Sequence, residues 1–443
     1  MTNRPTEPDA VPAGAMPAGE IRARWAWVEA TVWTERRLTA LEPGVLGGKW
    51  FSLMDKVYAR PNLQRAFERV KANGGAAGVD HVTVEEFEGH REANLEKLAR
   101  SLKDGSYRPQ AIRRAWIDKL GSQEKRPLGI PTVRDRVAQA ALRAVWEPIF
   151  ERDFAAPSYG FRPNRGCKEA RRRVDALLKI GYNWVVDADL PSYFDTIPHA
   201  ALLDRVKEKV SDGKGLELLQ AFLTQKVMET AEGWTPEEGT PQGAVISPLL
   251  SNIYLDPLDH RMAAAGLEMV RYADDFVLRC RSEAEARAAL EPVQAWTASA
   301  GLELHPTKTR IVDATPPGGF DFLGYHFEQG QRWPRRKSLA KFKDTIRSKT
   351  RRTHGQSLSA LVTDLNRTLR GWFVDFKHSH RFTFTALDGW ARMRLRSILR
   401  RRQSRVGRGR GADHQRWPNA FFAEQGLFSL TTAPATACPS SRR

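Results

Sequence analysis

Short apolar runs separated by polar positions mark the middle of the chain as rich in strands. Two such runs flank Ala273-Asp274-Asp275, and this order predicts a strand, a turn and a second strand over residues 268–279. A third apolar run leads into Asp187 and Asp189. The pattern therefore predicts two adjacent carboxylates at a hairpin tip and two more at a strand end.

Other stretches have the spacing of helices. Residues 63–70 form an amphipathic pattern that ends at a stop signal, Asn73-Gly74-Gly75, and residues 133–148 carry small apolar side chains on one face. Ser247-Pro248 predicts a helix start with a capping serine and a proline in the first turn. Residues 20–53 also have helical spacing with several tryptophans, and suggest no function.

A second hairpin is predicted where two β-rich runs, 112–119 and 126–131, are joined by a polar turn. It carries several cationic positions. Further along, a loop contains Gly239 and Gly243, which would allow its backbone to approach a ligand closely.

The acidic residues allow two interpretations. Aspartates are common in ordinary turns, because their side chains bond to the local backbone. However, a carboxylate at the end of an apolar strand, such as Asp187 or Asp189, is costly to bury without a partner. A divalent cation shared by the strand end and the hairpin would remove that cost, and oxygen ligands without histidine or cysteine favour Mg²⁺.

Charge is distributed unevenly along the 443 residues, a length that predicts more than one domain. Of the formal net charge of +18, residues 331–410 contribute +19, with 23 Lys or Arg and 4 Asp, so the rest of the chain is near neutral. A basic segment suits a polyanionic partner. Aromatic residues interleaved with this charge favour a nucleic-acid surface over a generic solvated face.

The three cysteines, Cys167, Cys280 and Cys438, lie far apart and form no Cys-x-x-Cys pair, which argues against a zinc module and a disulfide framework. Neither a secretory signal nor an apolar run of membrane-spanning length is present. We therefore expect a protein of a reducing cytoplasm with no membrane partner.

At this point several segments carry a resemblance to a known family. Tyr272-Ala-Asp-Asp275 resembles the catalytic box of reverse transcriptases, and Asp189-Leu-Pro-Ser-Tyr-Phe-Asp-Thr-Ile-Pro-His199 resembles the first catalytic box of the group II intron branch. Further boxes follow in the family's order over roughly residues 60–432; they lie at 76–80, 112–131, 158–166, 239–252, 298–310, 320–325, 369–373, 387–390 and 417–422.

The resemblance implies roles for individual residues. It implies that Asp189, Asp274 and Asp275, with the carbonyl of Leu190, hold two Mg²⁺ ions that activate a 3′ oxygen and stabilise the leaving pyrophosphate. It places Phe194 under the sugar of the incoming nucleotide. The other residues that it assigns to the nucleotide are Gln242, Arg126, Lys119 (or Lys125, because the turn is about one residue longer than usual) and Lys308, for which an ordinary surface lysine is the alternative.

Some matched positions stay open. Residues 76–80 resemble an extra amino-terminal motif of the family but also fit a glycine turn, and Arg162 and Arg165 suit either template or structural contacts. Pro191 stands where many relatives carry lysine. The chain also stops without the Cys- and His-bearing nuclease domain of some relatives, so we expect any DNA insertion to use another nick or a replication fork.

The basic segment is similar to the family's thumb and maturase regions, which bind RNA and duplex phosphates. Its cations recur at helical spacing beside an apolar face that includes Leu395 and Ile398. The predicted RNA-binding residues are Arg335, Arg336, Lys337, Arg351, Arg352, Arg392, Arg394, Arg396, Arg400, Arg401 and Arg402.

We expect an α+β right-hand polymerase with fingers, palm and a helical thumb, followed by a helical, basic RNA-binding region. The predicted units are a disordered lead (1–20), an N-terminal helical extension (21–59), reverse transcriptase fingers and palm (60–330), a thumb and maturase-like domain (331–432) and a tail (433–443).

The expected function is RNA-directed DNA synthesis for a group II intron, with assistance to its splicing and copying into cDNA for retrohoming. The expected partners are structured intron RNA, an RNA template with a DNA primer, dNTPs and target DNA, and the oligomeric state stays open. One alternative is a host-domesticated reverse transcriptase in defence or repair. Two others are a non-catalytic RNA-binding splicing cofactor and a polymerase of another lineage.

Overall fold

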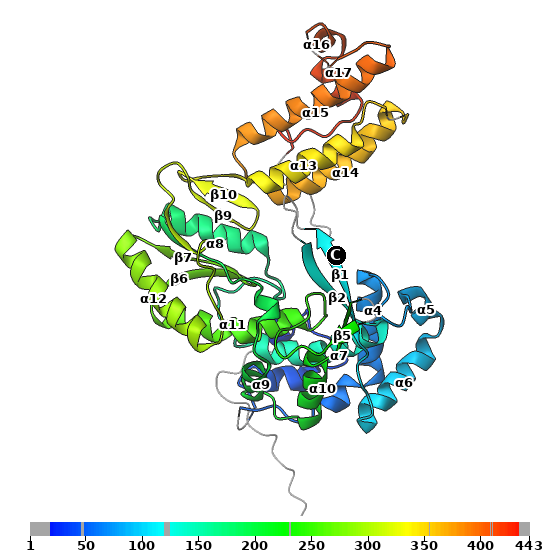
Figure 1. Cartoon of the computed structure of the whole chain (residues 1–443), viewed down its shortest axis with the longest axis vertical. Coiled ribbons are helices and arrows are strands. Elements are labelled where there is room, and N and C mark those ends of the chain that lie inside the picture. The colour runs from blue at the N-terminus through cyan, green and yellow to red at the C-terminus, as the bar shows by residue number, and fades with distance from the viewer. Residues whose placement is uncertain are drawn as a thin grey trace, which may run out of the picture.

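The computed structural model describes residues 18–45, 48–118, 125–229, 232–353, 355–407, 409 and 411–433. Its helices and strands form two blocks: a large one that contains the palm and fingers, and a helical thumb at the opposite end of the long axis (Figure 1). Helices and sheets are mixed within the large block, which confirms the predicted α+β class.

The palm is built on an antiparallel sheet with strand order β6-β7-β3-β8. Both faces of this sheet are buried. Val186, Phe276 and Leu278 pack into the core shared with α11 and α12, whereas Val185 and Val277 pack on the opposite face with α8. The elements are β3 (Trp184–Ala188), β6 (Glu268–Tyr272), β7 (Asp275–Cys280), β8 (Arg310–Asp313), α8 (Cys167–Lys179), α11 (Ser247–Ala264) and α12 (Glu283–Ser299).

The fingers combine a second sheet, of order β2-β1-β4-β5, with helices that surround α7. The two predicted helices are present: α4 ends at Asn73 before Gly74, which has a φ of +61°, and α7 extends three residues beyond the predicted Pro148. The elements are β1 (Ile112–Asp118), β2 (Lys125–Ile130), β4 (Val227–Glu229), β5 (Glu232–Trp234), α4 (Arg60–Asn73), α5 (Val84–Gly89), α6 (Arg91–Asp104), α7 (Val133–Glu151), η1 (Tyr193–Asp195), α9 (His199–Lys207) and α10 (Gly213–Leu223).

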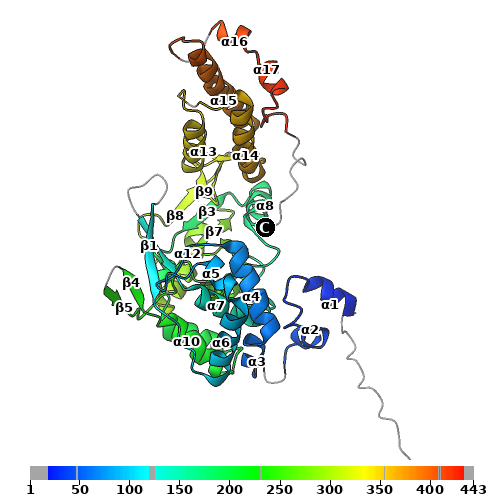
Figure 2. The same ribbon diagram turned by 90° about the vertical axis from the view of Figure 1, so that its right-hand side faces the viewer.

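The N-terminal helices α1 (Ala18–Arg24), α2 (Glu35–Leu41) and α3 (Met54–Val57) flank the fingers (Figure 2). Trp33 is buried in the same hydrophobic core, and its Nε1 donates to the carbonyl of Ala144 in α7 at 3.1 Å. The extension is therefore part of the large block. Helix α1 already includes the end of the expected lead, while residues 1–17 and 434–443 lie outside the described residues.

A small sheet of order β11-β10-β9 connects the palm to the thumb. The predicted thumb boundary after residue 330 falls within the β10–β11 hairpin, so the helical unit begins only at Arg336. The thumb has a separate core around Ile346, Leu365 and Leu395. The elements are β9 (Phe320–Phe322), β10 (Tyr325–Glu328), β11 (Gln331–Pro334), α13 (Arg336–Lys349), α14 (Leu358–Phe376), α15 (Arg381–Arg402), α16 (Asp413–Arg416) and α17 (Asn419–Glu424).

One local prediction was wrong in its detail. Helix α11 begins at Ser247 as expected, but the serine hydroxyl donates to the carbonyl of Pro241 at 2.9 Å and does not cap the helix. The hydroxyl instead ties the helix start to the loop before it. Across the described part of the chain, none of the helices is long and apolar enough to cross a membrane.

Candidate active site

The predicted acidic hairpin is present at one end of the palm sheet. Strands β6 and β7 are joined by Ala273 and Asp274, and Asp275 is the first residue of β7. Ala188, the last residue of β3, pairs with Phe276, so the next residue of the chain, Asp189, emerges beside Asp275. Asp189 and Asp275, which are 86 positions apart in the chain, thus bring their carboxylates to the same sheet edge.

These carboxylates repel one another. Surrounding protein atoms displace water from the carboxylate of Asp275 and raise its pKa to about 7, although one side of this residue stays open to solvent; the charges of Asp187, Asp274 and Asp189 act in the same direction. Burial also raises the pKa of Asp274, while the positive charge of Arg126 opposes the rise. The site therefore concentrates negative charge on carboxylates that protein atoms shield only partly from solvent.

The donor set suits a divalent cation, because it consists of carboxylate oxygens and a cation would relieve their repulsion. In this conformation, Lys308 pairs with Asp189 at 3.1 Å and Arg310 pairs with Asp187 at 3.2 Å. Among the residues described, no group of three or more His, Cys, Asp or Glu side chains is gathered closely enough to hold a metal ion. The carboxylate oxygens suit a metal centre, and in this conformation the ammonium group of Lys308 pairs with Asp189.

The cationic hairpin of the fingers faces this site. Arg126 lies on β2 opposite Ile117, is exposed, and is close enough for its charge to act on Asp274. Lys119 lies outside the described residues, so the choice between Lys119 and Lys125 stays open; Lys125 is exposed at the start of β2. Arg126 is therefore placed to bind an anion in front of the acidic edge.

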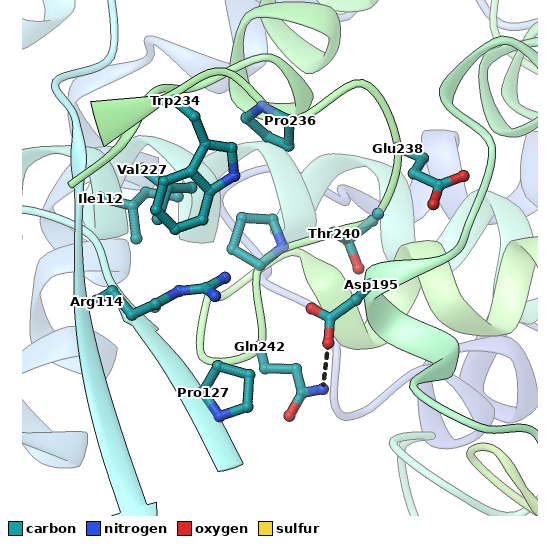
Figure 3. Close-up of a pocket in the computed structure, with 13 residues that line it drawn as sticks. Ile112, Arg114, Pro127, Asp195, Val227, Trp234, Pro236, Glu238, Thr240 and Gln242 are labelled. Carbon is teal, nitrogen blue, oxygen red and sulfur yellow. Dashed lines mark hydrogen bonds between the residues drawn. The ribbon is translucent and has the colours of Figure 1, made fainter. Parts of the chain in front are cut away.

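A cavity of about 280 Å³ lies between the fingers sheet and the loop that carries Gln242 (Figure 3). The side-chain amide of Gln242 donates to Asp195 at 3.4 Å, and the backbone carbonyl of Gln242 accepts from the backbone N–H of Gly129 at 2.6 Å. The guanidinium of Arg114 points into the cavity beside Trp234, at 4.7 Å from the ring centroid. Gln242 thus lies at a polar cavity next to η1.

Phe194 is half-buried one residue before Asp195, at the centre of a row of rings. Its ring centroid is 5.6 Å from that of Tyr193 and 6.4 Å from that of Phe161, which in turn lies 6.2 Å from Tyr272. Sequence reasoning did not single out Phe161, although it stands in the matched box 158–166. It is exposed and has a φ of +58°, so tertiary contacts hold it beside Phe194.

Comparisons with known proteins identify the family of the chain. The family model described as "Reverse transcriptase (RNA-dependent DNA polymerase)" matches residues 117–327, and the one described as "Group II intron, maturase-specific domain" matches residues 339–417. Protein YkfC of Escherichia coli (strain K12) is 33% identical over 324 residues, which cover 64% of this chain and 84% of that protein. The chain belongs to the group II intron reverse transcriptase and maturase family.

Two further similarities are more limited. The group II intron-encoded protein LtrA of Lactococcus lactis subsp. cremoris is 37% identical over 210 residues, which are 47% of this chain and only 35% of LtrA. Among solved structures, a partial Cas6-RT-Cas1--Cas2 complex matches with a TM-score of 0.36 and 22% identity over 56% of this chain and 41% of that chain. A likeness this loose supports no conclusion about function.

In this member of the family, the two glycines of the 239–243 loop have protein neighbours. A Cβ on Gly239 would lie 2.8 Å from backbone atoms of Asp195, and one on Gly243 would lie 2.5 Å from the carbonyl oxygen of Gly129. Both also have positive φ. The two glycines therefore let the loop approach η1 and the fingers sheet closely.

Arg162 and Arg165 both make contacts within the protein. Arg162 is buried, and its guanidinium binds both carboxylate oxygens of Glu151 and the carbonyls of Ala155 and Ser158. Arg165 donates to the carbonyl of Ala156 at 2.7 Å. Both arginines hold the segment that runs beside β6.

The predicted RNA-binding cations divide into three groups by their exposure. Arg396 is a correction: it is 1% exposed, donates to the carbonyl of Trp417 and to Asn419, and stacks over Phe422, so it stabilises the thumb core. Three others are half-buried: Arg392, Arg394 and Arg400. Arg394 donates hydrogen bonds to Thr350, and Arg400 pairs with Asp413. Those exposed to solvent are Arg336, Lys337, Arg351, Arg352, Arg401 and Arg402.

Arg335 lies between the two regions, the palm and the thumb. It precedes α13 at the palm–thumb junction, is half-buried, and lies near enough to Asp275 for its charge to oppose the rise in the pKa of that carboxylate. Arg335 therefore faces the acidic edge of the palm as well as the thumb.

Proposed function

We propose that the chain is the RNA-directed DNA polymerase of a group II intron, which binds the intron RNA, assists its splicing and copies it into cDNA for retrohoming. One observation supports the catalytic part most strongly: Asp189, Asp274 and Asp275 meet at one edge of the palm sheet, opposite Arg126 of the fingers. A protein that only bound RNA would have no use for so much repelling negative charge.

The proposed cofactor is a pair of Mg²⁺ ions held by Asp189, Asp274, Asp275 and the carbonyl of Leu190. When bound, they would lower the pKa of the primer 3′ hydroxyl and stabilise the charge on the leaving pyrophosphate. The cations of the chain complete the site. Arg126 would bind the triphosphate of the dNTP, while Lys308, which neutralises Asp189 in this conformation, would approach the triphosphate or the primer end.

Two further residues are proposed to select the nucleotide. The ring of Phe194 would lie under the sugar and exclude a 2′ hydroxyl by its bulk. Gln242 would contact the nucleotide from the loop beside Asp195. The packing of Phe194 against Tyr193 and Phe161 supports a fixed ring position, which steric exclusion requires.

The RNA partner is proposed to bind along the thumb. Its exposed arginines and lysine project from α13, the loop that follows it and the end of α15, and such cations bind phosphates without reading the base sequence. The proposed substrates and partners are structured intron RNA, an RNA template with a DNA primer, dNTPs and target DNA.

The double variant Asp274→Asn/Asp275→Asn tests this proposal. It keeps side-chain size but removes the two charges that would hold the metal ions, so cDNA synthesis should fall by several orders of magnitude. Intron RNA binding and splicing assistance should stay at parental levels, because they depend on the thumb. Primer extension and splicing assays on the same preparations measure both.

Two results would count against the proposal. Parental cDNA synthesis in the double variant would exclude these aspartates from catalysis. Failure of the parent protein to assist splicing of any adjacent intron, together with intact cDNA synthesis, would favour a host-domesticated reverse transcriptase instead.

A further inference from the structure

The acidic hairpin turns through an unfavourable backbone conformation. Two-residue turns between antiparallel strands favour Asn-Gly and similar pairs, because their central residues require positive φ. Here the turn is made by Ala273 and Asp274, and Ala273 has a φ of +60°. This conformation strains alanine, because its Cβ comes close to the following carbonyl oxygen. Contacts from outside the turn must therefore hold it.

Arg271 provides such contacts. It is fully buried on β6, and its Nη1 donates to the carbonyl of Ala273 at 2.9 Å and to the side-chain oxygen of Asn252 at 3.0 Å. Its Nε donates to the two carboxylate oxygens of Asp259 at 2.8 and 3.0 Å, and its Nη2 donates to the same carboxylate. One guanidinium thus links the turn to two side chains of α11.

The α11 side of this network is fixed as well. Asn252 and Asp259 are buried and lie seven residues apart, which puts them on one face of the helix two turns from each other. The amide of Asn252 also donates to the carbonyl of Gly160 at 2.8 Å. Because the donors and acceptors are matched and water is excluded, the arrangement has little freedom to shift.

The backbone on the other side of the turn packs equally closely. The amide of Arg271 donates to the carbonyl of Pro157 at 2.9 Å, and its carbonyl accepts from the amide of Tyr159 at 2.8 Å. Gly160 then lies against the turn itself: a Cβ there would collide with the backbone nitrogen of Ala273. Residues 157–160 and α11 thus enclose the turn from two directions.

We propose that Arg271 is a positioning residue for the polymerase centre. Held by Asp259 and Asn252, it fixes the peptide after Ala273 and so aims the carboxylates that follow toward bound divalent cations; the inference rests on the proposed function. Apolar residues of similar volume often stabilise a core as well as a buried ion pair does. No apolar side chain, however, can donate a hydrogen bond to the carbonyl of Ala273.

The same sheet offers a matched control. Arg279 on β7 is also fully buried, but its guanidinium lies 5.1 Å from the ring centroid of Phe320 and donates to the carbonyl of Tyr182, at the opposite end of the strand from Asp275. Arg279→Met therefore removes a buried arginine from the palm without touching the turn.

The test compares Arg271→Met with Arg279→Met in the full-length protein. Electron paramagnetic resonance measures Mn²⁺ binding without nucleic acid, and primer extension on an RNA template measures kcat and the KM for dNTP. We expect Arg271→Met to weaken Mn²⁺ binding and to lower kcat by about 10- to 100-fold, as loss of a group that orients metal ligands does. The KM for dNTP should change little. Arg279→Met should keep parental Mn²⁺ affinity and kcat.

A second variant, Arg271→Met/Asp259→Leu, separates loss of the positioning contact from loss of stability in the first variant. It removes both buried charges, so its Tm should return toward that of the parent while Mn²⁺ affinity and kcat stay low. Parental Mn²⁺ affinity in this stable double variant would overturn the positioning role. If the parent binds Mn²⁺ in an Arg271-dependent way but makes no cDNA, the proposed function fails and the positioning role stands.

Discussion

The acidic edge of the palm and the basic surface of the thumb hold their charge in different ways. In the palm, the charges of Asp187, Asp189 and Asp274 all act on Asp275, and a buried network fixes the turn that carries Asp274. In the thumb, the exposed cations are spread over α13, the loop after it and the end of α15. The first arrangement suits a ligand that needs exact geometry, and the second suits a long polyanion.

Each region also contains a buried arginine, and the two arginines stabilise different contacts. Arg271 in the palm donates to the turn that carries the carboxylates, whereas Arg396 in the thumb donates to the carbonyl of Trp417 and joins α15 to the segment before α17. A buried arginine in this protein therefore marks a fixed junction. Single substitutions that disturb the acidic turn should consequently have large effects, and those on the thumb surface should have small, additive effects.

The largest expected contrast is between two glycine substitutions. Gly160→Ala places a methyl group against the backbone of Ala273, which must move, and a displacement of about 1 Å near reacting groups costs about 100-fold in rate. Gly389→Ala on α15 meets no atom within 4 Å and should stabilise that helix by about 1 kcal/mol. Primer extension and thermal unfolding of both variants measure these effects. A Gly160→Ala protein that polymerises at the parental rate would show that the turn tolerates displacement.

Nucleotide selection gives the next contrast. Phe194→Ala should admit ribonucleotides and reduce discrimination against them on the order of tenfold to a hundredfold, because the cavity left by the ring can hold the 2′ hydroxyl. Phe382→Ala, which removes an exposed ring at the start of α15, should leave discrimination unchanged. Incorporation of dNTP and rNTP on one RNA template measures both. Equal discrimination in all three proteins would make Phe194 a packing residue.

On the thumb surface, the effect should scale with the number of charges removed. Changing Arg351, Arg352, Arg401 and Arg402 to Gln should reduce the slope of log affinity for intron RNA against log salt by about three, because each phosphate contact releases counterions. RNA binding measured over a salt series gives this slope. A control with four exposed arginines of the large block changed to Gln should keep it; these are Arg36, Arg100, Arg172 and Arg287. Equal slopes in the two variants would place the RNA elsewhere.

The smallest expected effect is on stability in the absence of metal. The pKa of Asp275 is raised in the folded state, so between the ordinary carboxyl value and about 7 the folded protein binds more protons than the unfolded one. Stability should therefore fall as pH rises through this window. Asp275→Asn should raise the Tm of the metal-free protein at pH 8 and change it little at pH 4. A constant difference at both values would show that Asp275 ionisation does not destabilise the fold.

The local pattern of the chain was sufficient to predict many elements. Alternation of apolar and polar residues predicted the acidic hairpin, and helical spacing with a glycine stop predicted the end of α4 at Asn73. The matched boxes also predicted the family, which the comparisons confirm. These features depend on residues that are near one another in the sequence, where propensity and periodicity act directly.

Packing between elements determines which of the charged residues are buried in internal contacts and which are exposed to solvent. Nothing near Arg396 in the sequence distinguishes it from Arg401, yet one lies in a core and the other in solvent. The periodicity of a helix gives its faces, but only packing against α17 and Trp417 determines which face is covered. The predicted RNA-binding role of Arg396 was wrong for this reason.

The same holds for the acidic edge itself. Apolar runs and turn residues are local signals, so they were sufficient to predict which carboxylates stand at strand ends and turns. Only the fold decided that Lys308 pairs with Asp189 across 119 positions, and that Arg271 joins Ala273 to Asp259. Contacts of this kind depend on how β3, β6 and α11 pack together, and that packing follows from the whole hydrophobic core and from no single segment.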